Sequence, residues 1–190
     1  LAVMLVLNPN SVNPFEPVRD EMLTRGKVPM TKEEVRWVSV ARLGVQPGDN
    51  VWDVGAGTGA VTFELARKAM DGAVFAVERN TEAIELIAQN RQKLGGFNVH
   101  IVQGHAPEVL ADLPKPNCVF VGGSGGNMRE IIETALMKNP EARIAVNAIV
   151  LETLQETQRL FAEFGLQEVE ITQLSAARGK SVGCYTMMTA

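Results

Sequence analysis

The stretch VWDVGAGTGAV at residues 51–61 has the residue types of a loop that binds a small molecule against the protein backbone. Glycines occupy positions 55, 57 and 59, where they remove side chains and permit backbone angles that other residues resist. Asp53 precedes the first glycine by two positions. The helix expected from about Ala60 directs free N–H groups at the same place, where a carboxylate or phosphate binds favourably. The stretch therefore predicts a binding loop between a strand and a helix.

Glu78 is a second residue with a chemical role. It ends the next apolar run of the chain, where an acidic side chain can accept hydrogen bonds from both ribose hydroxyls of a bound nucleoside. The glycine spacing is G-x-G-x-G, whereas dinucleotide enzymes carry G-x-G-x-x-G. An NAD enzyme, and a tight glycine turn beside an incidental acid, are the alternatives that this pattern leaves open.

A second glycine-rich turn, VGGSGG at 121–126, follows a later apolar run. The candidate substrate-side residues in it are Gly122, Gly123, Ser124, Gly125 and Gly126. A simple turn needs one or two glycines rather than four, so the excess favours close approach by a bulky substrate. The alternative is a flexible turn between a strand and a helix.

The elements that must position these turns alternate between short apolar runs and longer amphipathic segments. The expected strands are 51–54, 73–78, 99–103, 117–121 and 143–150. The expected helices between and after them are 60–69, 81–94, 105–112, 126–138 and 151–164. This alternation predicts an α/β fold in which a parallel sheet is covered by helices on both faces. Two further strand candidates, 167–174 and 183–190, have no helix between them and predict an antiparallel pair at one end.

An additional helix is expected before the first of these strands, from about Thr31 to Leu43. Thr31 and Glu34 match a capping box, in which each side chain bonds a backbone N–H at the start of a helix. The apolar residues of VRWVSVARL then recur with helical spacing. The segment VQPGD at 45–49 ends the helix.

Composition limits the classes of function. The 190 residues are 46% hydrophobic and 21% charged, which suffices for the core of one domain, and the formal net charge of −4 argues against a nucleic-acid partner. Cys118 and Cys184 lack the spacing of metal ligands or of a disulfide framework, so we expect no metal and a cytoplasmic location. The opening run Leu1 to Leu7 is too short to span a bilayer and lacks signal-peptide features, so we expect no membrane segment.

The chain is expected to divide into two parts. Residues 1–19 combine a strand-like run with the segment NPNSVNPFEP, whose asparagines and prolines favour a linker. This part is either the tail of an upstream domain or a trimmed end. Residues 20–190 form the single α/β domain.

The segment DVGAGTG together with Glu78 resembles the class I S-adenosylmethionine-dependent methyltransferases, whose first motif reads apolar-x-Asp-apolar-Gly-x-Gly-x-Gly. The resemblance implies S-adenosyl-L-methionine as the cofactor. It also implies the class I fold, a mostly parallel seven-stranded sheet with helices on both faces and an antiparallel edge pair.

The resemblance narrows to one family over residues 20–190. The segments that carry it are RGKVPMTKEEVR (25–36), DVGAGTGAVTFELA (53–66), AVERNTEAIELIAQN (76–90), GHAPEVL (104–110), FVGGSGG (120–126) and ARGKSVGCYTMMTA (177–190). They are similar to the corrin-ring methyltransferases of vitamin B12 biosynthesis, which methylate carbon 15 of a precorrin and decarboxylate the ring C acetate. The resemblance thus implies a decarboxylating C-methyltransferase whose substrate is a precorrin or cobalt-precorrin tetrapyrrole.

The family motifs imply a set of cofactor-binding residues. They are Thr31, Asp53, Gly55, Ala56, Gly57, Thr58, Gly59, Glu78, Arg79, Gly104, His105 and Ala106. Thr31 would contact the cofactor, the glycine loop would surround its methionine part, Glu78 would hold the ribose, and the backbone at Ala106 would meet the adenine. Family members usually carry an acidic residue where this chain has His105, so we expect His105 at the rim or adenine edge and assign no catalytic residue.

Substrate binding and assembly are further expectations. A precorrin carries several carboxylates, so cations in the matched segments, Arg25, Lys27, Arg178 and Lys180, are candidates to bind it, with ordinary surface solvation as the alternative. The apolar, methionine-rich C-terminal segment 179–190 could pack against another subunit. Related enzymes form tetramers, so we expect a homotetramer. In many bacteria the activity is fused to an N-terminal half that methylates carbon 5. The opening run LAVMLVLN resembles the closing strand of such a half.

Two other functions stay open from the sequence. One is a class I methyltransferase that acts on tRNA, protein or another small molecule. The other is a catalytically silent module that binds S-adenosylmethionine.

Overall fold

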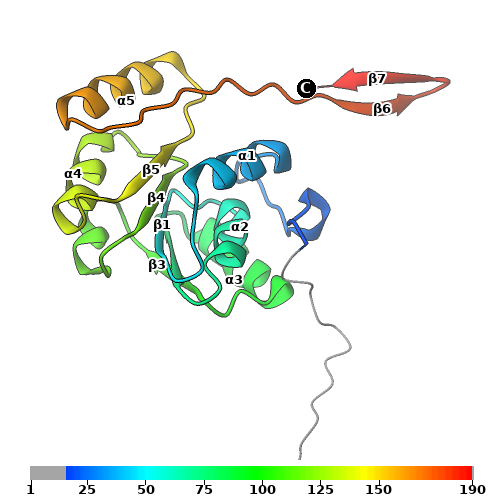
Figure 1. The fold of residues 1–190 in the computed structure, drawn as a ribbon. Coiled ribbons are helices and arrows are strands. Elements are labelled where there is room, and N and C mark those ends of the chain that lie inside the picture. The colour runs from blue at the N-terminus through cyan, green and yellow to red at the C-terminus, as the bar shows by residue number, and fades with distance from the viewer. Residues whose placement is uncertain (1–15, 190) are drawn as a thin grey trace, which may run out of the picture.

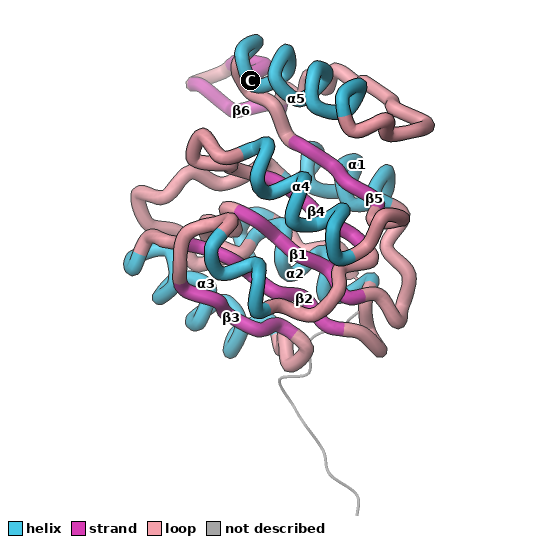
Figure 2. The backbone as a smooth tube through the Cα atoms, turned by 90° about the vertical axis from the view of Figure 1, so that its left-hand side faces the viewer, coloured by secondary structure: helices cyan, strands magenta, loops and turns pink. Residues whose placement is uncertain are grey.

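The computed structural model describes residues 16–189, so the strand expected at Leu1 to Leu7 lies outside the described residues. Five parallel strands form one sheet in the order β3-β2-β1-β4-β5 (Figures 1 and 2). Their bounds are β1 Asn50–Val54, β2 Ala73–Glu78, β3 Val99–Gln103, β4 Cys118–Val121 and β5 Arg143–Val146. The strand order reverses between β1 and β4, and the crevice at such a switch point is where open α/β sheets bind ligands.

Helices cover both faces of this sheet, as the alternation predicts. Their bounds are α1 Glu33–Leu43, α2 Ala60–Lys68, α3 Thr81–Leu94, α4 Met128–Lys138 and α5 Leu151–Glu163, with short 3₁₀ helices η1 Asp20–Met22 and η2 Glu108–Asp112. Successive strand residues face opposite sides. Val51 therefore packs with α1, α2 and α3 in one core, whereas Trp52 packs with η2, α4 and α5 in another. No helix within residues 16–189 has the length and apolar composition needed to cross a membrane.

The start of α1 differs from the predicted capping box. The helix begins at Glu33 with Lys32 as its N-cap, and no side chain caps it. Thr31 lies one residue further out, where its backbone carbonyl accepts a hydrogen bond from Arg36 Nη1 at 2.5 Å. The predicted capping box was wrong because the helix starts one residue later than expected, so the N-cap position falls on Lys32, whose side chain has no acceptor for a backbone N–H.

Two other boundaries are shorter than predicted. The expected helix 105–112 is only the 3₁₀ helix at Glu108–Asp112, because Pro107 supplies no N–H for a continuous helix. The strand expected at 143–150 ends at Val146, and residues 147–150 lead into α5.

The predicted seven-stranded sheet was wrong in its strand count. Strands β6 Arg178–Val182 and β7 Tyr185–Thr189 pair only with each other and form a separate antiparallel hairpin, while 167–174 is irregular. Gly183, at φ 61°, stands in a two-residue turn that favours such local pairing. The hairpin projects from the body of the molecule (Figure 1) and leaves β5 as a sheet edge.

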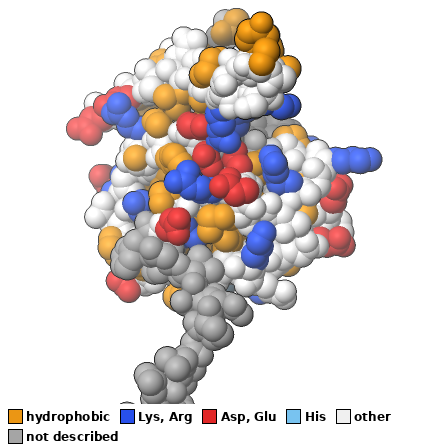
Figure 3. Space-filling model, turned by 90° about the vertical axis from the view of Figure 1, so that its right-hand side faces the viewer, with side chains coloured by type: hydrophobic (Ala, Val, Ile, Leu, Met, Phe, Trp, Pro, Cys, Tyr) orange, Lys and Arg blue, Asp and Glu red, His pale blue; other side chains and the backbone are white. Residues whose placement is uncertain are grey.

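A buried charge cluster connects the N-terminal segment to α1 and the hairpin. Arg36 is fully buried, and its guanidinium donates to Asp20 Oδ1 at 2.6 Å and to the Val18 carbonyl at 2.7 Å. Arg178 of β6 reaches Asp20 Oδ2 at 3.2 Å and Glu34 Oε1 at 2.7 Å. Acidic and basic side chains lie side by side on this face of the molecule (Figure 3). The cluster therefore holds together segments that are distant in sequence.

Candidate active site

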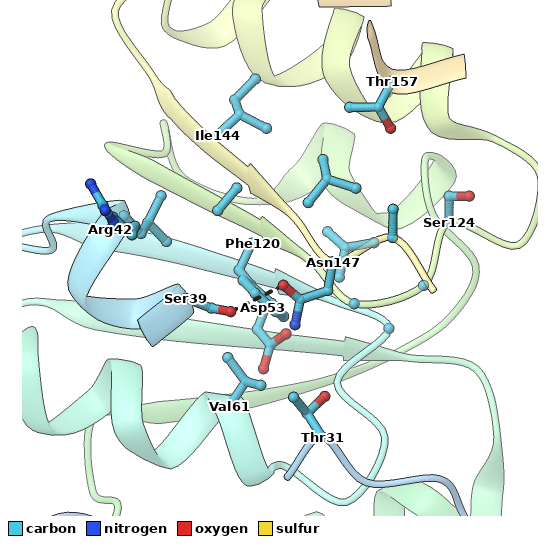
Figure 4. Close-up of a pocket in the computed structure, with 18 of the residues that line it drawn as sticks. Thr31, Ser39, Arg42, Asp53, Val61, Phe120, Ser124, Ile144, Asn147 and Thr157 are labelled. Carbon is cyan, nitrogen blue, oxygen red and sulfur yellow. Dashed lines mark hydrogen bonds between the residues drawn. The ribbon is translucent and has the colours of Figure 1, made fainter. Parts of the chain in front are cut away.

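The candidate site is an open cavity at the carboxyl ends of the strands. Val54 pairs with Val77 of β2 and with Val121 of β4, so the three strands end at the same level. The turns that follow them are thereby brought to one place. The cavity extends past the end of β5 and along α1 and α5 (Figure 4).

The two glycine turns predicted from sequence contact each other. Gly55, Gly57 and Gly59 all have positive φ, at 75°, 57° and 79°. A Cβ atom on Gly55 would lie 2.6 Å from the carbonyl oxygen of Gly123. Gly55 is thus required both by its backbone angle and by the backbone of the second turn. Gly122, Gly123, Ser124 and Gly125 line the cavity, whereas Gly126 does not.

The Glu78 carboxylate organises the backbone around the first turn. Its Oε2 accepts from the Gly57 N–H at 2.9 Å, and its Oε1 accepts from the N–H groups of Arg79 and Asn80, each at 2.9 Å. The side chain therefore connects the end of β2 to the glycine loop after β1. Glu78 also lines the cavity.

Asp53 is a buried acid with one unused oxygen. Its side-chain Oδ2 accepts from Thr62 Oγ1 at 2.5 Å, while Oδ1 is buried and has no partner among residues 16–189. Burial raises the pKa of Asp53 to about 7, helped by the nearby charge of Glu78 and opposed by the Thr62 hydrogen bond. An orphaned buried acceptor at the glycine loop is suited to bind a cationic or donor group of a ligand.

His105 lies at the edge of the cavity, within a small polar cluster. Its Nε2 is 3.2 Å from Arg79 Nη1 and its Nδ1 is 3.2 Å from Glu108 Oε2, and the side chain is 41% exposed. Since a guanidinium only donates, Nε2 accepts and Nδ1 carries the proton toward Glu108. Asn127 donates to the Ala106 carbonyl at 3.0 Å beside it. Gly104 and Ala106 complete this wall.

The four candidate substrate cations are not gathered around the glycine turns. Arg178 is paired with carboxylates, and this ion pair holds the pKa of Glu34 down to about 2. Arg25 lines a smaller cleft of about 430 Å³ together with Arg178. Lys27 and Lys180 are exposed and border neither cavity. The sequence could not show that Arg178 has acidic partners, because they lie more than 140 residues away.

The structure adds two polar residues that sequence analysis missed. Ser39 Oγ donates to Asn147 Oδ1 at 3.0 Å inside the cavity (Figure 4). Ser39 belongs to α1 and Asn147 follows β5 directly. The interruption of the apolar run RIAVNAIV by one asparagine was the signal that could have marked this position.

The sheet order, the glycine turn after β1 and the acid at the end of β2 define the Rossmann-like methyltransferase class. Comparison with known proteins agrees and narrows the class. The family model described as "Precorrin methyltransferase domain" matches residues 24–190, so the chain belongs to this family.

Similar proteins and structures support the family. A "Probable cobalt-precorrin-6B C(15)-methyltransferase (decarboxylating)" of Pyrobaculum calidifontis is 41% identical over 176 residues, covering 91% of this chain and 90% of that protein. A cobalt-precorrin-6B C(15)-methyltransferase (decarboxylating) of Salmonella typhimurium is 36% identical, covering 83% and 82%. The crystal structure of a precorrin 8w decarboxylase from Methanobacterium thermoautotrophicum, 39% identical, superimposes with a TM-score of 0.85 over 90% of this chain and 93% of that one.

Proposed function

We propose that this protein transfers a methyl group from S-adenosyl-L-methionine to carbon 15 of cobalt-precorrin-6B or precorrin-6B and removes the carboxyl group of the ring C acetate, in cobalamin biosynthesis. The observation that carries the proposal is the 41% identity, over about nine tenths of both chains, to a protein of that name. The crevice described above supports the same activity.

The residues around the crevice fit S-adenosylmethionine. Glu78 would hold the ribose hydroxyls, and the bare backbone at Gly55 and Gly57 leaves room for the methionine part. The unpartnered Asp53 Oδ1 suits the ammonium group, and the segment from Gly104 to Ala106 would border the adenine. Thr31 also lines the cavity. When bound, S-adenosylmethionine supplies an electrophilic methyl group on a sulfonium.

The chemistry asks the protein mainly for alignment. Holding two reactants in line can supply about 7–11 kcal/mol of a barrier. The nucleophile is the electron-rich conjugated ring of the substrate. In the decarboxylation, the bond between the carboxyl carbon and the acetate methylene breaks, carbon dioxide leaves, and the electron pair enters the macrocycle, which then takes up a proton. We assign the substrate side to Gly122, Gly123, Ser124 and Gly125, the part of the second glycine turn that lines the cavity.

The test is product analysis. The purified chain is incubated with S-adenosylmethionine and either cobalt-free or cobalt-loaded precorrin-6B, and the product mass is measured. We expect the gain of one methyl group and the loss of carbon dioxide, with the faster reaction identifying the natural substrate. Binding of S-adenosylmethionine with neither mass change would indicate a silent module, and methylation of added tRNA or protein would indicate another acceptor.

Replacing Glu78 by glutamine should weaken S-adenosylmethionine binding by about tenfold to a hundredfold, because hydrogen bonds to a charged acceptor contribute about 1.5–3 kcal/mol. The glutamine NH2 would also replace one of the two acceptor oxygens, and so would oppose either the Gly57 N–H or the N–H groups of Arg79 and Asn80. Isothermal titration calorimetry measures the change. Glu130→Gln, on the exposed face of α4, is the matched control and should bind normally. Equal affinities for the two variants would remove Glu78 from the site.

S-adenosylmethionine binding should tighten as the pH rises from about 5.5 to about 7.5. This pH interval lies below the pKa of a free α-amino group, so the ammonium group of the cofactor stays charged throughout it. The pKa of Asp53 is raised to about 7, so its carboxyl is largely protonated at the lower pH. An ammonium group beside Oδ1 favours the ionised form of the Asp53 carboxyl. Binding must therefore release the proton of Asp53, which makes binding weaker at the lower pH, where this carboxyl is protonated. The expected gain is about tenfold.

Calorimetry at several pH values in two buffers of different ionisation enthalpy measures both the affinity and the proton release. Asp53→Asn should bind more weakly and should lose the pH dependence, since asparagine does not titrate in this range. A pH dependence that survives in Asp53→Asn would assign the effect to another group.

We further propose that the chain works as a cytoplasmic homo-oligomer, a tetramer, that can occur fused to a C5-methyltransferase domain. The support is the hairpin, whose Tyr185, Met187 and Met188 are 75%, 53% and 68% exposed, and the unpaired edge of β5. Apolar surface of this kind favours burial by another subunit. Gel filtration at several concentrations measures the oligomeric state, and a monomer at every concentration would contradict the proposed tetramer.

A further inference from the structure

Ser39 and Asn147 form a fixed polar pair in the cavity. The Asn147 backbone N–H donates to the Val121 carbonyl at 3.0 Å, which continues the β4–β5 ladder one residue beyond the strand. Its side-chain Oδ1 accepts from Ser39 Oγ at 3.0 Å. Both the backbone and the amide plane of Asn147 are therefore held by rigid elements, as an exact ligand contact requires.

The amino end of this amide is available to a ligand. Asn147 Nδ2 carries two N–H donors, and no residue within 16–189 accepts from them. The side chain lines the cavity, where the hydrogen bond from Ser39 is its drawn contact (Figure 4). Because Ser39 occupies the amide oxygen, the amino group is the end of the side chain that is left for a ligand.

The position of Asn147 separates it from the cofactor crevice. Glu78 ends β2, whereas Asn147 follows β5, which lies beyond β4 at the opposite edge of the sheet. At ordinary strand spacing, β5 is about 10 Å from β1. A cofactor held by Glu78 and Asp53 would occupy the part of the cavity at the ends of β2 and β1, and would leave the part at the end of β5 for a second ligand.

We infer that Asn147 Nδ2 donates a hydrogen bond to an acceptor oxygen of the methyl-accepting substrate, and that Ser39 is the positioning residue that orients the amide. The inference rests on the proposed function, under which the substrate is a macrocycle with several carboxylates. A peripheral carboxylate oxygen is the acceptor that such a substrate offers to the amide N–H. The pair thus fixes how the ring lies against the transferable methyl group.

The test compares Asn147→Ala, Ser39→Ala and Ser39→Thr in the full chain. With cobalt-precorrin-6B at saturating S-adenosylmethionine, Asn147→Ala should lower kcat/KM by about tenfold or more, mainly through KM. Ser39→Ala should give a smaller loss of the same kind, and Ser39→Thr, which keeps the hydroxyl, should restore activity. The affinity for S-adenosylmethionine, measured by calorimetry, should stay unchanged in all three.

Asn98→Ala is the matched control for a merely structural loss. Asn98 donates to the Ala66 and Ala69 carbonyls at 3.0 and 2.8 Å, away from the cavity. This variant should lose thermal stability and keep the substrate KM. An unchanged KM in Asn147→Ala, or an equal loss of cofactor affinity, would overturn the inference while leaving the proposed function intact. A wild-type chain that binds S-adenosylmethionine but converts no precorrin would instead refute the proposed function.

Discussion

Replacing Arg36 by methionine should destabilise the folded protein by about 3–5 kcal/mol, because it leaves a buried carboxylate without its nearest cation. The Arg36 side chain is fully buried, and Asp20 is 8% exposed with its Oδ1 only 2.6 Å from the guanidinium. The carbonyls of Val18 and Thr31 lose a donor in the same step. Urea denaturation followed by circular dichroism measures the change.

Arg42→Met provides the control for this prediction. Arg42 also lies on α1 and also forms an ion pair, with Glu170 at 2.9 Å, but the two side chains are 62% and 68% exposed. Exposed pairs contribute about 0–1 kcal/mol, so this variant should stay close to wild type. If both variants unfold at the same urea concentration, burial of the Arg36 cluster does not contribute as proposed.

Gly55→Ala should lower stability by about 2–4 kcal/mol and also abolish S-adenosylmethionine binding. The residue has φ 75°, which strains any side chain, and the new Cβ would meet the oxygen, nitrogen and Cα of Gly123 at 2.6, 2.8 and 3.0 Å. These are backbone atoms, so the clash is relieved only by separating the two turns that border the cavity. Thermal unfolding and calorimetric titration measure the two effects.

Gly48→Ala is the matched substitution. Gly48 precedes β1, it has no positive φ, and a Cβ atom there would meet nothing within 4 Å. Its stability should change by less than about 0.5 kcal/mol, and binding should be unaffected. Normal binding by Gly55→Ala would contradict the assignment of this loop to the cofactor.

Local pattern was enough to place the main elements and the glycine and acidic residues at the carboxyl ends of β1 and β2. The alternation of apolar runs and amphipathic segments predicted all five parallel strands, because strand and helix periodicities are properties of short windows. The same holds for Glu78 at the end of β2 and for the glycines at the turn after β1. Element boundaries were less certain, as at the start of α1, where the N-cap is Lys32 and not the predicted Thr31.

The sequence by itself therefore determined the fold class and the family, and it predicted the residues that we propose for cofactor binding, since all of these depend on residue types at fixed short spacings. Only the tertiary structure decided which residues meet across the chain. Three such contacts join segments far apart in sequence: the close approach of Gly55 to Gly123, the Ser39–Asn147 hydrogen bond, and the ion pairs of Arg178 with acidic residues. Burial of Asp53, which raises its pKa, depends likewise on the packing around it. Spacing along the chain carries no information about such neighbours, because packing selects them when the whole domain folds.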